Sequence, residues 1–305
     1  MSKARIAFVE LAGAAGLLYS LLSSPETRRI IDESEIVYWP TIGKTGPIED
    51  IDIAFISGTA KTRSHVNTVR SIRENTRILV AYGTSAIYGG VPGMTALLRP
   101  GDHHGYMELD EEHKNLEETV RPITSITEPD ILVPGEPPSE EANRILSETI
   151  EKLLNGEAMN KPIYVFTGEN LCKHCPRRPK NIEKLEMPGI KSVFEVDTRN
   201  DKCFLELGIL CMGPVTASGC GHVCIRMNQP CTGCNGPARG VVDQGLNYIS
   251  SFTSILLKSK ERQVMFDYFA KELDKLHDPM GYFYRYTLPK AMLTRLALKK
   301  RGVEE

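Results

Sequence analysis

The sequence predicts an α/β protein with two parts: a doubly wound parallel-sheet domain over residues 1–157, and an irregular, cysteine-rich domain with C-terminal helices over residues 158–305. In the first half of the chain, apolar strand-like runs alternate with helical stretches, which is typical of a parallel sheet covered on both faces. From Asn160 to about Arg239 the chain is instead rich in glycine and proline, has little periodicity and holds all 8 cysteines.

The first domain is expected to contain five short apolar strands, at Arg5–Val9, Glu35–Trp39, Ile51–Ile56, Arg77–Ala81 and Ile131–Val133. Helices are expected between and after them, at Ala14–Ser24, ended by Pro25, and at Thr62–Asn75 and Ser139–Leu154. Ser139 suits a helix N-terminus because its hydroxyl can accept a bond from a free backbone amide. We interpret this order as a flavodoxin-like domain, in which the loops after the carboxyl ends of the strands carry the sites.

Regular structure is expected to return after the cysteines. Val241–Leu273 is predicted to form one or two helices, and Pro289–Arg301 a basic amphipathic tail. The tail is most simply a solvated helix face, with partner docking as the alternative.

Composition excludes several classes of protein. The chain has 305 residues, of which 41% are hydrophobic and 25% charged, as in ordinary globular proteins. Lys and Arg number 37 against 39 Asp and Glu, so the basic excess of a nucleic-acid-binding protein is missing. The apolar run Leu11–Leu22 is shorter than the roughly 20 residues of a membrane span and does not resemble a secretory signal. We therefore expect a cytoplasmic protein, where clustered cysteines favour metal binding over disulfides.

The cysteine spacing indicates two metal clusters. The pairs are Cys172-x2-Cys175, Cys203-x7-Cys211, Cys220-x3-Cys224 and Cys231-x2-Cys234. Eight thiolates suffice for two 4Fe–4S clusters or two zinc sites. Zinc ribbons usually pair two tight C-x2-C turns around one ion, whereas each set of four here has only one, so the spacing favours 4Fe–4S clusters, with zinc or disulfides as alternatives. His174 and His222 lie within these loops but are not expected to be ligands.

The simplest partition of the cysteines is sequential, although a fourth cysteine crosses to the neighbouring cluster in some ferredoxins. We call Cys172, Cys175, Cys203 and Cys211 the first set, and Cys220, Cys224, Cys231 and Cys234 the second set.

Two segments carry a resemblance to a known family. They read CFLELGILCMGPVTASGCGHVC from Cys203 to Cys224 and QPCTGCNGP from Gln229 to Pro237. They resemble the small, electron-transferring subunit of cytoplasmic nickel–iron hydrogenases, in particular the methyl-viologen-linked and deazaflavin-reducing enzymes of methanogenic archaea. The resemblance covers nearly the whole chain. It implies that the first set holds the distal 4Fe–4S cluster and the second set the medial one, and that a large nickel–iron subunit is the partner.

The same resemblance exposes a departure in the first domain. The family holds a third, proximal cluster there, on four cysteines from three loops, next to the nickel–iron centre of the large subunit. The corresponding positions are here occupied by Ala14, Leu17, Ser85 and Glu136. Alanine and leucine have no donor atom, and oxygen donors match iron–sulfur chemistry poorly. We therefore predict that the proximal cluster is absent and that packed side chains fill its volume.

Loss of this cluster would change the function, because electron tunnelling slows steeply with distance. The predicted protein is a non-catalytic electron-transfer subunit of a multisubunit oxidoreductase, uncoupled from any nickel–iron site. Its expected partners are a large-subunit homologue, which could itself be degenerate, and redox subunits such as a flavin or heterodisulfide-reductase-type module. The alternatives are a zinc-stabilised or electron-inert assembly scaffold, and a working hydrogenase small subunit with an unconventional relay.

Overall fold

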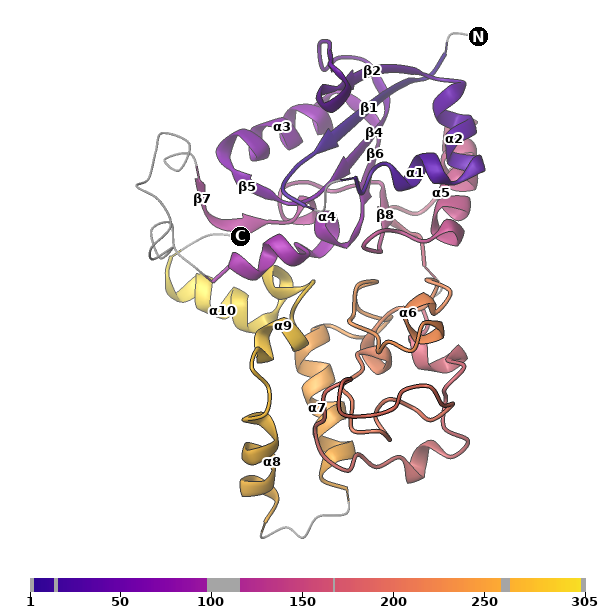
Figure 1. Cartoon of the computed structure of the whole chain (residues 1–305). Helices are drawn as coiled ribbons and strands as arrows, with labels where there is room; N and C mark the ends of the chain where they lie inside the picture. The colour runs from indigo at the N-terminus through magenta and orange to yellow at the C-terminus, as the bar shows by residue number, and fades with distance from the viewer. Residues whose placement is uncertain (1–2, 14–15, 98–115, 167, 259–263, 303–305) are drawn as a thin grey trace. The chain divides into compact units, whose positions relative to one another are not determined.

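A computed structural model describes residues 3–13, 16–97, 116–166, 168–258 and 264–302. The chain divides into two compact units, Met1–Phe166 together with Tyr286–Glu305, and Thr167–Arg285 (Figure 1). The sequence pattern places the C-terminal tail in the second domain. In the structure this segment contacts the first unit instead: the amide of Gly90 donates to the carbonyl of Tyr286 at 3.0 Å, and Pro289 packs against Gly89.

The first unit is built on a seven-stranded sheet with the order β3-β2-β1-β4-β6-β8-β9. All neighbouring strands in it are parallel except the β2–β3 pair. A short antiparallel pair, β5 with β7, lies outside this sheet. The strands are β1 (Arg5–Glu10), β2 (Glu35–Trp39), β3 (Lys44–Thr45), β4 (Ile51–Ser57), β5 (Ala60–Thr62), β6 (Thr76–Tyr82), β7 (Leu116–Arg121), β8 (Ile131–Val133) and β9 (Ile163–Tyr164).

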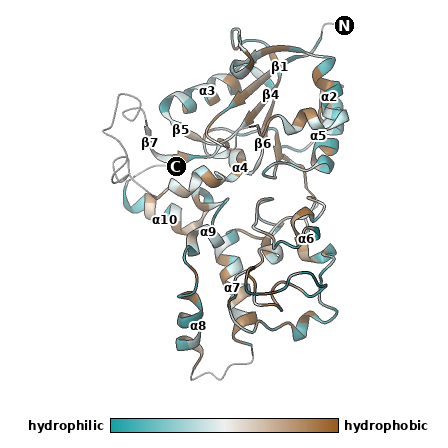
Figure 2. Cartoon of the chain, in the orientation of Figure 1, coloured by the Kyte–Doolittle hydropathy of each residue, from teal (hydrophilic) through white to brown (hydrophobic). Residues whose placement is uncertain are grey.

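The five predicted strands correspond to β2, β1, β4, β6 and β8 in spatial order, which is the 2-1-3-4-5 order of the flavodoxin-like fold. The α/β prediction is thus confirmed. Hydrophobic residues dominate the central strands (Figure 2), and they form buried clusters on both faces of the sheet. In β1, Ile6 and Phe8 enter one buried cluster while Ala7 and Val9 enter the other, because successive side chains of a strand point to opposite faces.

The first unit contains six α-helices within its described residues, and some of them cover the faces of the sheet. They are α1 (Ser20–Ser23), α2 (Pro25–Asp32), α3 (Arg63–Glu74), α4 (Thr84–Tyr88), α5 (Glu140–Leu154) and, near the C-terminus, α10 (Met292–Lys300). α2 and α5 lie side by side on one face, and α3 lies on the other (Figure 1). Two of the predicted helix starts fall on the N-caps: Thr62 caps α3 by accepting from the amide of His65, and Ser139 caps α5 by accepting from that of Ala142.

The helix predicted over Ala14–Ser24 is wrong in extent. Only Ser20–Ser23 is helical, and residues 14–15 lie outside the described part of the chain. Gly16 has a φ of +80°, which is incompatible with a right-handed helix, and Pro25 is the first residue of the next helix, α2. The apolar residues of this segment therefore enter the core from a turn followed by a short helix.

A buried carboxylate at one end of the sheet hydrogen-bonds three other segments of the first unit. Asp130, which precedes β8, accepts from Arg73 at 2.8 Å, from Lys161 at 2.7 Å and from the amide of Leu79 at 2.7 Å. Burial by itself would raise the pKa of Asp130, but these donors outweigh it and lower the pKa below its usual value. The ionised side chain thus stabilises the folded state at neutral pH.

The second unit has little regular structure apart from its helices. These are α6 (Val223–Arg226), α7 (Gln244–Leu256), α8 (Met265–Leu273) and α9 (Pro279–Phe283). Aromatic rings of α7, α8 and α9 pack together, with Phe252 at 6.2 Å from Phe269 and 6.4 Å from Phe283 between ring centroids. α7 and α8 fulfil the prediction of one or two helices over Val241–Leu273.

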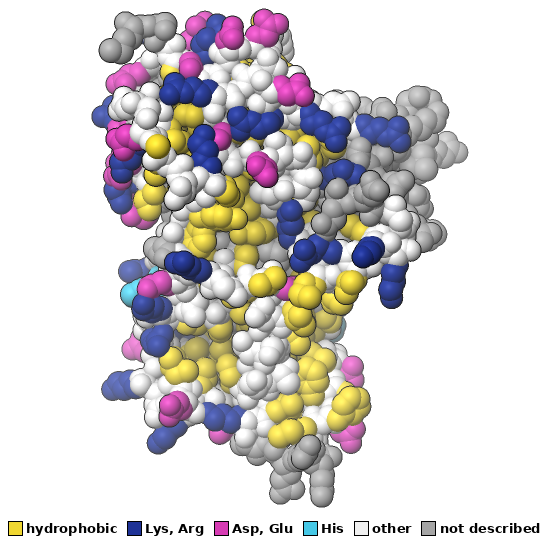
Figure 3. All heavy atoms as spheres, turned by 180° about the vertical axis from the view of Figure 1, so that it is seen from behind, with side chains coloured by type: hydrophobic (Ala, Val, Ile, Leu, Met, Phe, Trp, Pro, Cys, Tyr) yellow, Lys and Arg dark blue, Asp and Glu magenta, His cyan; other side chains and the backbone are white. Residues whose placement is uncertain are grey.

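The surface in Figure 3 carries Lys and Arg side chains interspersed with Asp and Glu. Of the helices within the described ranges, none combines the length and the apolar character that crossing a membrane requires.

Candidate metal-cluster sites

The four thiols of the first set lie near one another. Cys172 is on a short 3-10 turn, Leu171–His174, which Cys175 ends, and Cys203 and Cys211 come from the following irregular segment. Burial raises the pKa of the Cys172 thiol, and three neighbouring thiols raise it further, those of Cys211, Cys203 and Cys175. Burial likewise raises the pKa of Cys211 to about 12. These thiols are therefore protonated in the free protein, and a cation that binds them would have to displace their protons.

Glycine makes room between two sulfurs of the first set. A Cβ atom at Gly213 would lie 3.0 Å from the Sγ of Cys172 and 3.6 Å from the Sγ of Cys211. A side chain at this position would therefore crowd the sulfur of Cys172 and contact that of Cys211, whereas glycine leaves both free for another group. Such a cradle suits a group that is held by thiolates and touched by the main chain.

Backbone amides next to the cysteines act on the thiols in a regular pattern. For five of the cysteines, the backbone amide two residues further along the chain lowers the pKa of the thiol and so opposes the rise that burial causes. These amides belong to Arg177, Leu205, Gly213, His222 and Gly233, for Cys175, Cys203, Cys211, Cys220 and Cys231 respectively. Amides in these positions stabilise thiolate over thiol, which is what metal ligation requires.

The second set is more open than the first. Cys231 is buried, Cys220 and Cys234 are half-buried, and Cys224 is exposed. Burial raises the pKa of Cys220, and the thiol of Cys224 raises it further. Burial also raises the pKa of Cys231, to which Cys211 and Cys234 add. The structure thus pairs Cys220 with Cys224, pairs Cys231 with Cys234, and brings Cys231 near the first set.

The two histidines of these loops have other partners. His174 is exposed and its Nε2 lies 2.7 Å from Glu169, while the Nε2 of His222 lies 2.9 Å from the carbonyl oxygen of Leu171. Across the described residues, no group of three or more His, Cys, Asp or Glu side chains is arranged to hold a single metal ion.

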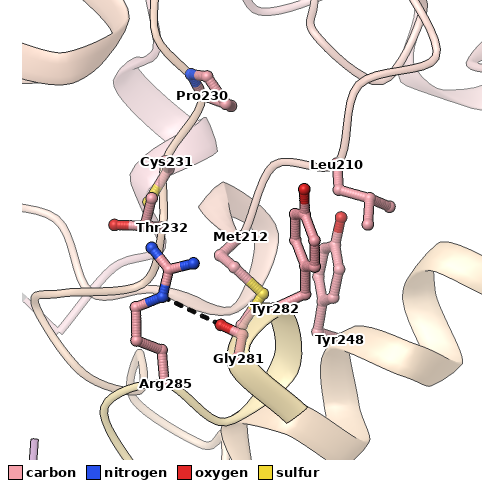
Figure 4. Close-up of a pocket in the computed structure, with 9 residues that line it drawn as sticks. All are labelled: Leu210, Met212, Pro230, Cys231, Thr232, Tyr248, Gly281, Tyr282 and Arg285. Carbon is pink, nitrogen blue, oxygen red and sulfur yellow. Dashed lines mark hydrogen bonds between the residues drawn. The ribbon is translucent and has the colours of Figure 1, made fainter. Parts of the chain in front are cut away.

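A small cavity of about 50 Å³ adjoins Cys231, enough for a few water molecules. Tyrosine rings from Tyr248 and Tyr282 form one wall, and the guanidinium of Arg285 points toward Thr232 (Figure 4). Arg285 is held there by a 3.1 Å bond from its Nε to the carbonyl of Gly281. The second set thus has a cationic and aromatic boundary on this side.

Ser85 and Glu136, two of the positions expected from the sequence to lie in the proximal-cluster loops, contact each other directly. The carboxylate of Glu136, in the loop after β8, accepts from the amide of Ser85 at 2.9 Å and from its hydroxyl at 2.8 Å. Ser85 is fully buried at the start of α4, after β6. Burial raises the pKa of Glu136, and the two bonds from Ser85 oppose the rise. Ser85 and Glu136 thus bind each other directly.

Leu17 fills the space beside this pair. Its side chain is 4% exposed, and a Cβ at Gly83 would lie only 2.3 Å from its Cδ2 atom. Leu17 therefore packs directly on the backbone of the loop after β6. Ala14, the fourth position, lies outside the described residues.

Two residues that contact the cysteines are not evident from the sequence. The amide of Cys211 donates to the buried hydroxyl of Tyr248, in α7, at 3.0 Å. No sequence pattern near either residue predicts this contact. In the sequence, Arg177 is only one of several cations close to Cys175, yet it is 6% exposed and stacks on Phe204 with its Cζ 4.3 Å from the ring centroid.

Comparisons with known proteins agree with the fold and the cysteine-rich unit. Residues 19–149 match the family described as "NADH ubiquinone oxidoreductase, 20 Kd subunit". A subunit of the F420-non-reducing hydrogenase of Methanothermobacter marburgensis is 31% identical, with 98% of this chain and 99% of that protein covered. The corresponding subunit of the F420-non-reducing vhu hydrogenase of Methanococcus voltae is 30% identical, with 96% and 98% covered.

Among solved structures, the NiFeSe hydrogenase of Desulfovibrio vulgaris Hildenborough matches with a TM-score of 0.53 over 78% of this chain and 94% of its own. At 18% identity this likeness concerns the fold alone. A flavodoxin-like unit followed by a cysteine-rich unit, with these relatives, defines a hydrogenase small subunit. Within that class, the chain belongs to the family of the F420-non-reducing hydrogenase small subunits of methanogens.

Proposed function

We propose that this small subunit transfers electrons through two 4Fe–4S clusters, one on each cysteine set, and that it lacks the proximal cluster. A relative from Archaeoglobus profundus, 27% identical, is named an iron-sulfur subunit. The observation that carries the proposal is the first set itself: Cys172 has the thiols of Cys175, Cys203 and Cys211 as neighbours, and Gly213 places no Cβ beside the sulfurs of Cys172 and Cys211. A bound cluster would supply one-electron redox chemistry, and the surrounding amides and burial would set its potential.

Two hydrogen bonds connect the two sets, one to a cysteine sulfur and one within the main chain. The amide of Cys231 donates to the Sγ of Cys211 at 3.4 Å, and the amide of Met212 donates to the carbonyl of Cys231 at 2.9 Å. A ligand of one proposed cluster is thereby hydrogen-bonded to a ligand of the other. This direct connection supports electron transfer between the two sites.

The closed loops of the first unit support the absence of a third cluster. Ser85 donates two hydrogen bonds to Glu136, and Leu17 packs against Gly83. A nickel–iron site in a large subunit would then have no first relay toward the second set. We therefore propose that the chain does not serve dihydrogen oxidation by the usual route.

The proposed partners follow from this role. They are a large-subunit homologue, which could have lost its own metal centre, and further redox subunits such as a flavin or heterodisulfide-reductase-type module. The subunit itself performs no bond chemistry. It would work in the reducing cytoplasm, where its thiols stay available for iron.

Iron and acid-labile sulfide analysis of the anaerobically purified chain tests the proposal. About eight iron atoms per chain and an EPR signal after dithionite reduction are expected. About twelve would restore the proximal cluster and refute its absence. Zinc with no visible absorbance would favour the scaffold alternative. Dihydrogen-dependent dye reduction by the native complex would favour a working hydrogenase subunit with another relay.

A further inference from the structure

Arg177 is a buried cation that connects segments of both cysteine sets. It lies two residues after Cys175, and its guanidinium donates to the carbonyl oxygens of Thr198 at 2.5 Å and Lys202 at 3.2 Å. Those carbonyls belong to the stretch that leads into Cys203. The same guanidinium donates to the Oδ1 of Asn228 at 2.6 Å.

Asn228 brings in the second set. It lies between Cys224 and Cys231 and has a φ of +58°, a left-handed conformation that asparagine tolerates better than most residues. The adjacent Gln229 amide donates to the carbonyl of Cys224 at 2.9 Å. The guanidinium of Arg177 thus holds the segment that precedes Cys203 in the first set. It also holds the turn between Cys224 and Cys231 in the second set.

The charge of Arg177 has no acidic partner among the described residues. Its hydrogen-bond acceptors are two peptide carbonyls and one amide, and its face lies on the ring of Phe204, which is 2% exposed. A guanidinium stays charged in proteins, and a buried charge is costly unless an anion is near. The charge of Arg177, like that of Arg178, lowers the pKa of the Cys175 thiol, so the first set, once its thiols are deprotonated on binding a cluster, would be an anion beside this guanidinium.

We propose that Arg177 is the counter-charge of the 4Fe–4S cluster on the first set and raises its reduction potential. This inference rests on the proposed function. Four thiolates give such a cluster a net negative charge, which grows by one unit on reduction. A fixed positive charge beside it favours the reduced form, because net charge is one of the factors that set cluster potentials. The bonds to Thr198, Lys202 and Asn228 hold that charge in place.

The experiment compares three variants of the full chain by EPR-monitored redox titration and iron analysis. Arg177→Gln removes the charge, and Arg177→Lys keeps the charge but loses the planar fork. Arg199→Gln removes a charge from an exposed residue of the same segment, whose side chain is 81% exposed and paired with Asp197. Wild-type iron content is measured first, so that absence of clusters is recognised as failure of the proposed function alone.

In Arg177→Gln, the ratio of reduced to oxidised cluster at a fixed potential should fall about ten-fold for one of the two clusters, equivalent to about 59 mV for a one-electron couple. Arg177→Lys should shift it less than about three-fold, and Arg199→Gln should leave both potentials unchanged because an exposed charge is screened. Unchanged potentials in iron-replete Arg177→Gln would overturn the inference, as would an equal shift in Arg177→Lys. Loss of iron from both Arg177 variants would make the residue purely structural and would also overturn it.

Discussion

Returning cysteines to the four proximal positions should create a third cluster. The variant carries Ala14→Cys, Leu17→Cys, Ser85→Cys and Glu136→Cys, and its iron content is expected to rise from about eight to about twelve atoms per chain. The scaffold for such a site is in place, because the loops after β6 and β8 are already joined. The amide of Gly83 donates to Val133 at 2.8 Å, and that of Thr84 donates to Gly135 at 2.9 Å.

The structure gives the cost of these changes in the iron-free state. Leu17 is almost fully buried against Gly83, and shortening it to cysteine leaves a cavity worth about 1–3 kcal/mol. Removing Glu136 breaks both of its bonds to Ser85, at about 1–3 kcal/mol. The iron-free variant should therefore be less stable than the wild type by about 2–6 kcal/mol. Cluster binding should recover much of this difference, because metal binding couples to folding.

Iron and sulfide analysis, EPR and urea unfolding of the anaerobically reconstituted protein measure these effects. The matched control is Ala14→Ser, Leu17→Ser and Glu136→Ser, which disturbs the same loops without adding sulfur and should keep about eight iron atoms. If the cysteine variant folds, as judged by circular dichroism, and still holds only the wild-type amount of iron, the three loops do not form a cluster site and the reasoning fails.

Three further changes test other parts of the structure. Gly213→Ala places a methyl group 3.0 Å from the sulfur of Cys172, so iron content should fall by up to about four atoms per chain; full iron content would show that the cradle is not needed. Asp130→Asn should cost about 2 kcal/mol at pH 7. Because the pKa of Asp130 is lower in the folded than in the unfolded state, its contribution to stability is complete above the unfolded pKa and is lost as the pH falls through the folded pKa. In urea titrations, the difference in unfolding free energy between the wild type and the variant should therefore shrink below about pH 4. A difference that stays constant with pH would contradict this. Chelation of iron after oxidation should make Thr167–Arg285 sensitive to protease before the sheet unit, as mass spectrometry of the fragments would show, whereas simultaneous cleavage of both units would refute it.

The fold of the first unit was predictable because its signals are local. Apolar runs such as Ile51–Ile56 and capped helices such as the one after Ser139 carry their own periodicity and end markers. The exception, Ala14–Ser24, has helical composition, but Gly16 adopts a positive φ. A glycine permits that conformation without revealing it, so the sequence could not distinguish a turn from a helix there.

The cysteine sets were visible in the sequence, but their surroundings were not. Spacing alone groups the thiols, since short C-x2-C turns bring two sulfurs together. The contact between Tyr248 and Cys211 spans 37 residues, and the bond from Arg177 to Asn228 spans 51. Such contacts depend on how irregular segments pack, and an arginine beside a cysteine is as consistent with solvation as with burial. Only the tertiary structure distinguishes the two.

At the positions proposed to correspond to the proximal cluster, the side chains complement one another. An unfilled site there would leave a cavity and unpartnered backbone groups at the ends of β6 and β8, both of which are destabilising. Here each need is met by a different side chain: Leu17 supplies apolar volume, and Glu136 accepts from both the amide and the hydroxyl of Ser85. Glu136 alone would be a half-buried carboxylate without donors, and Ser85 alone a buried amide without an acceptor. The pair therefore stabilises the loops without a metal, and a cluster could bind there only by displacing it.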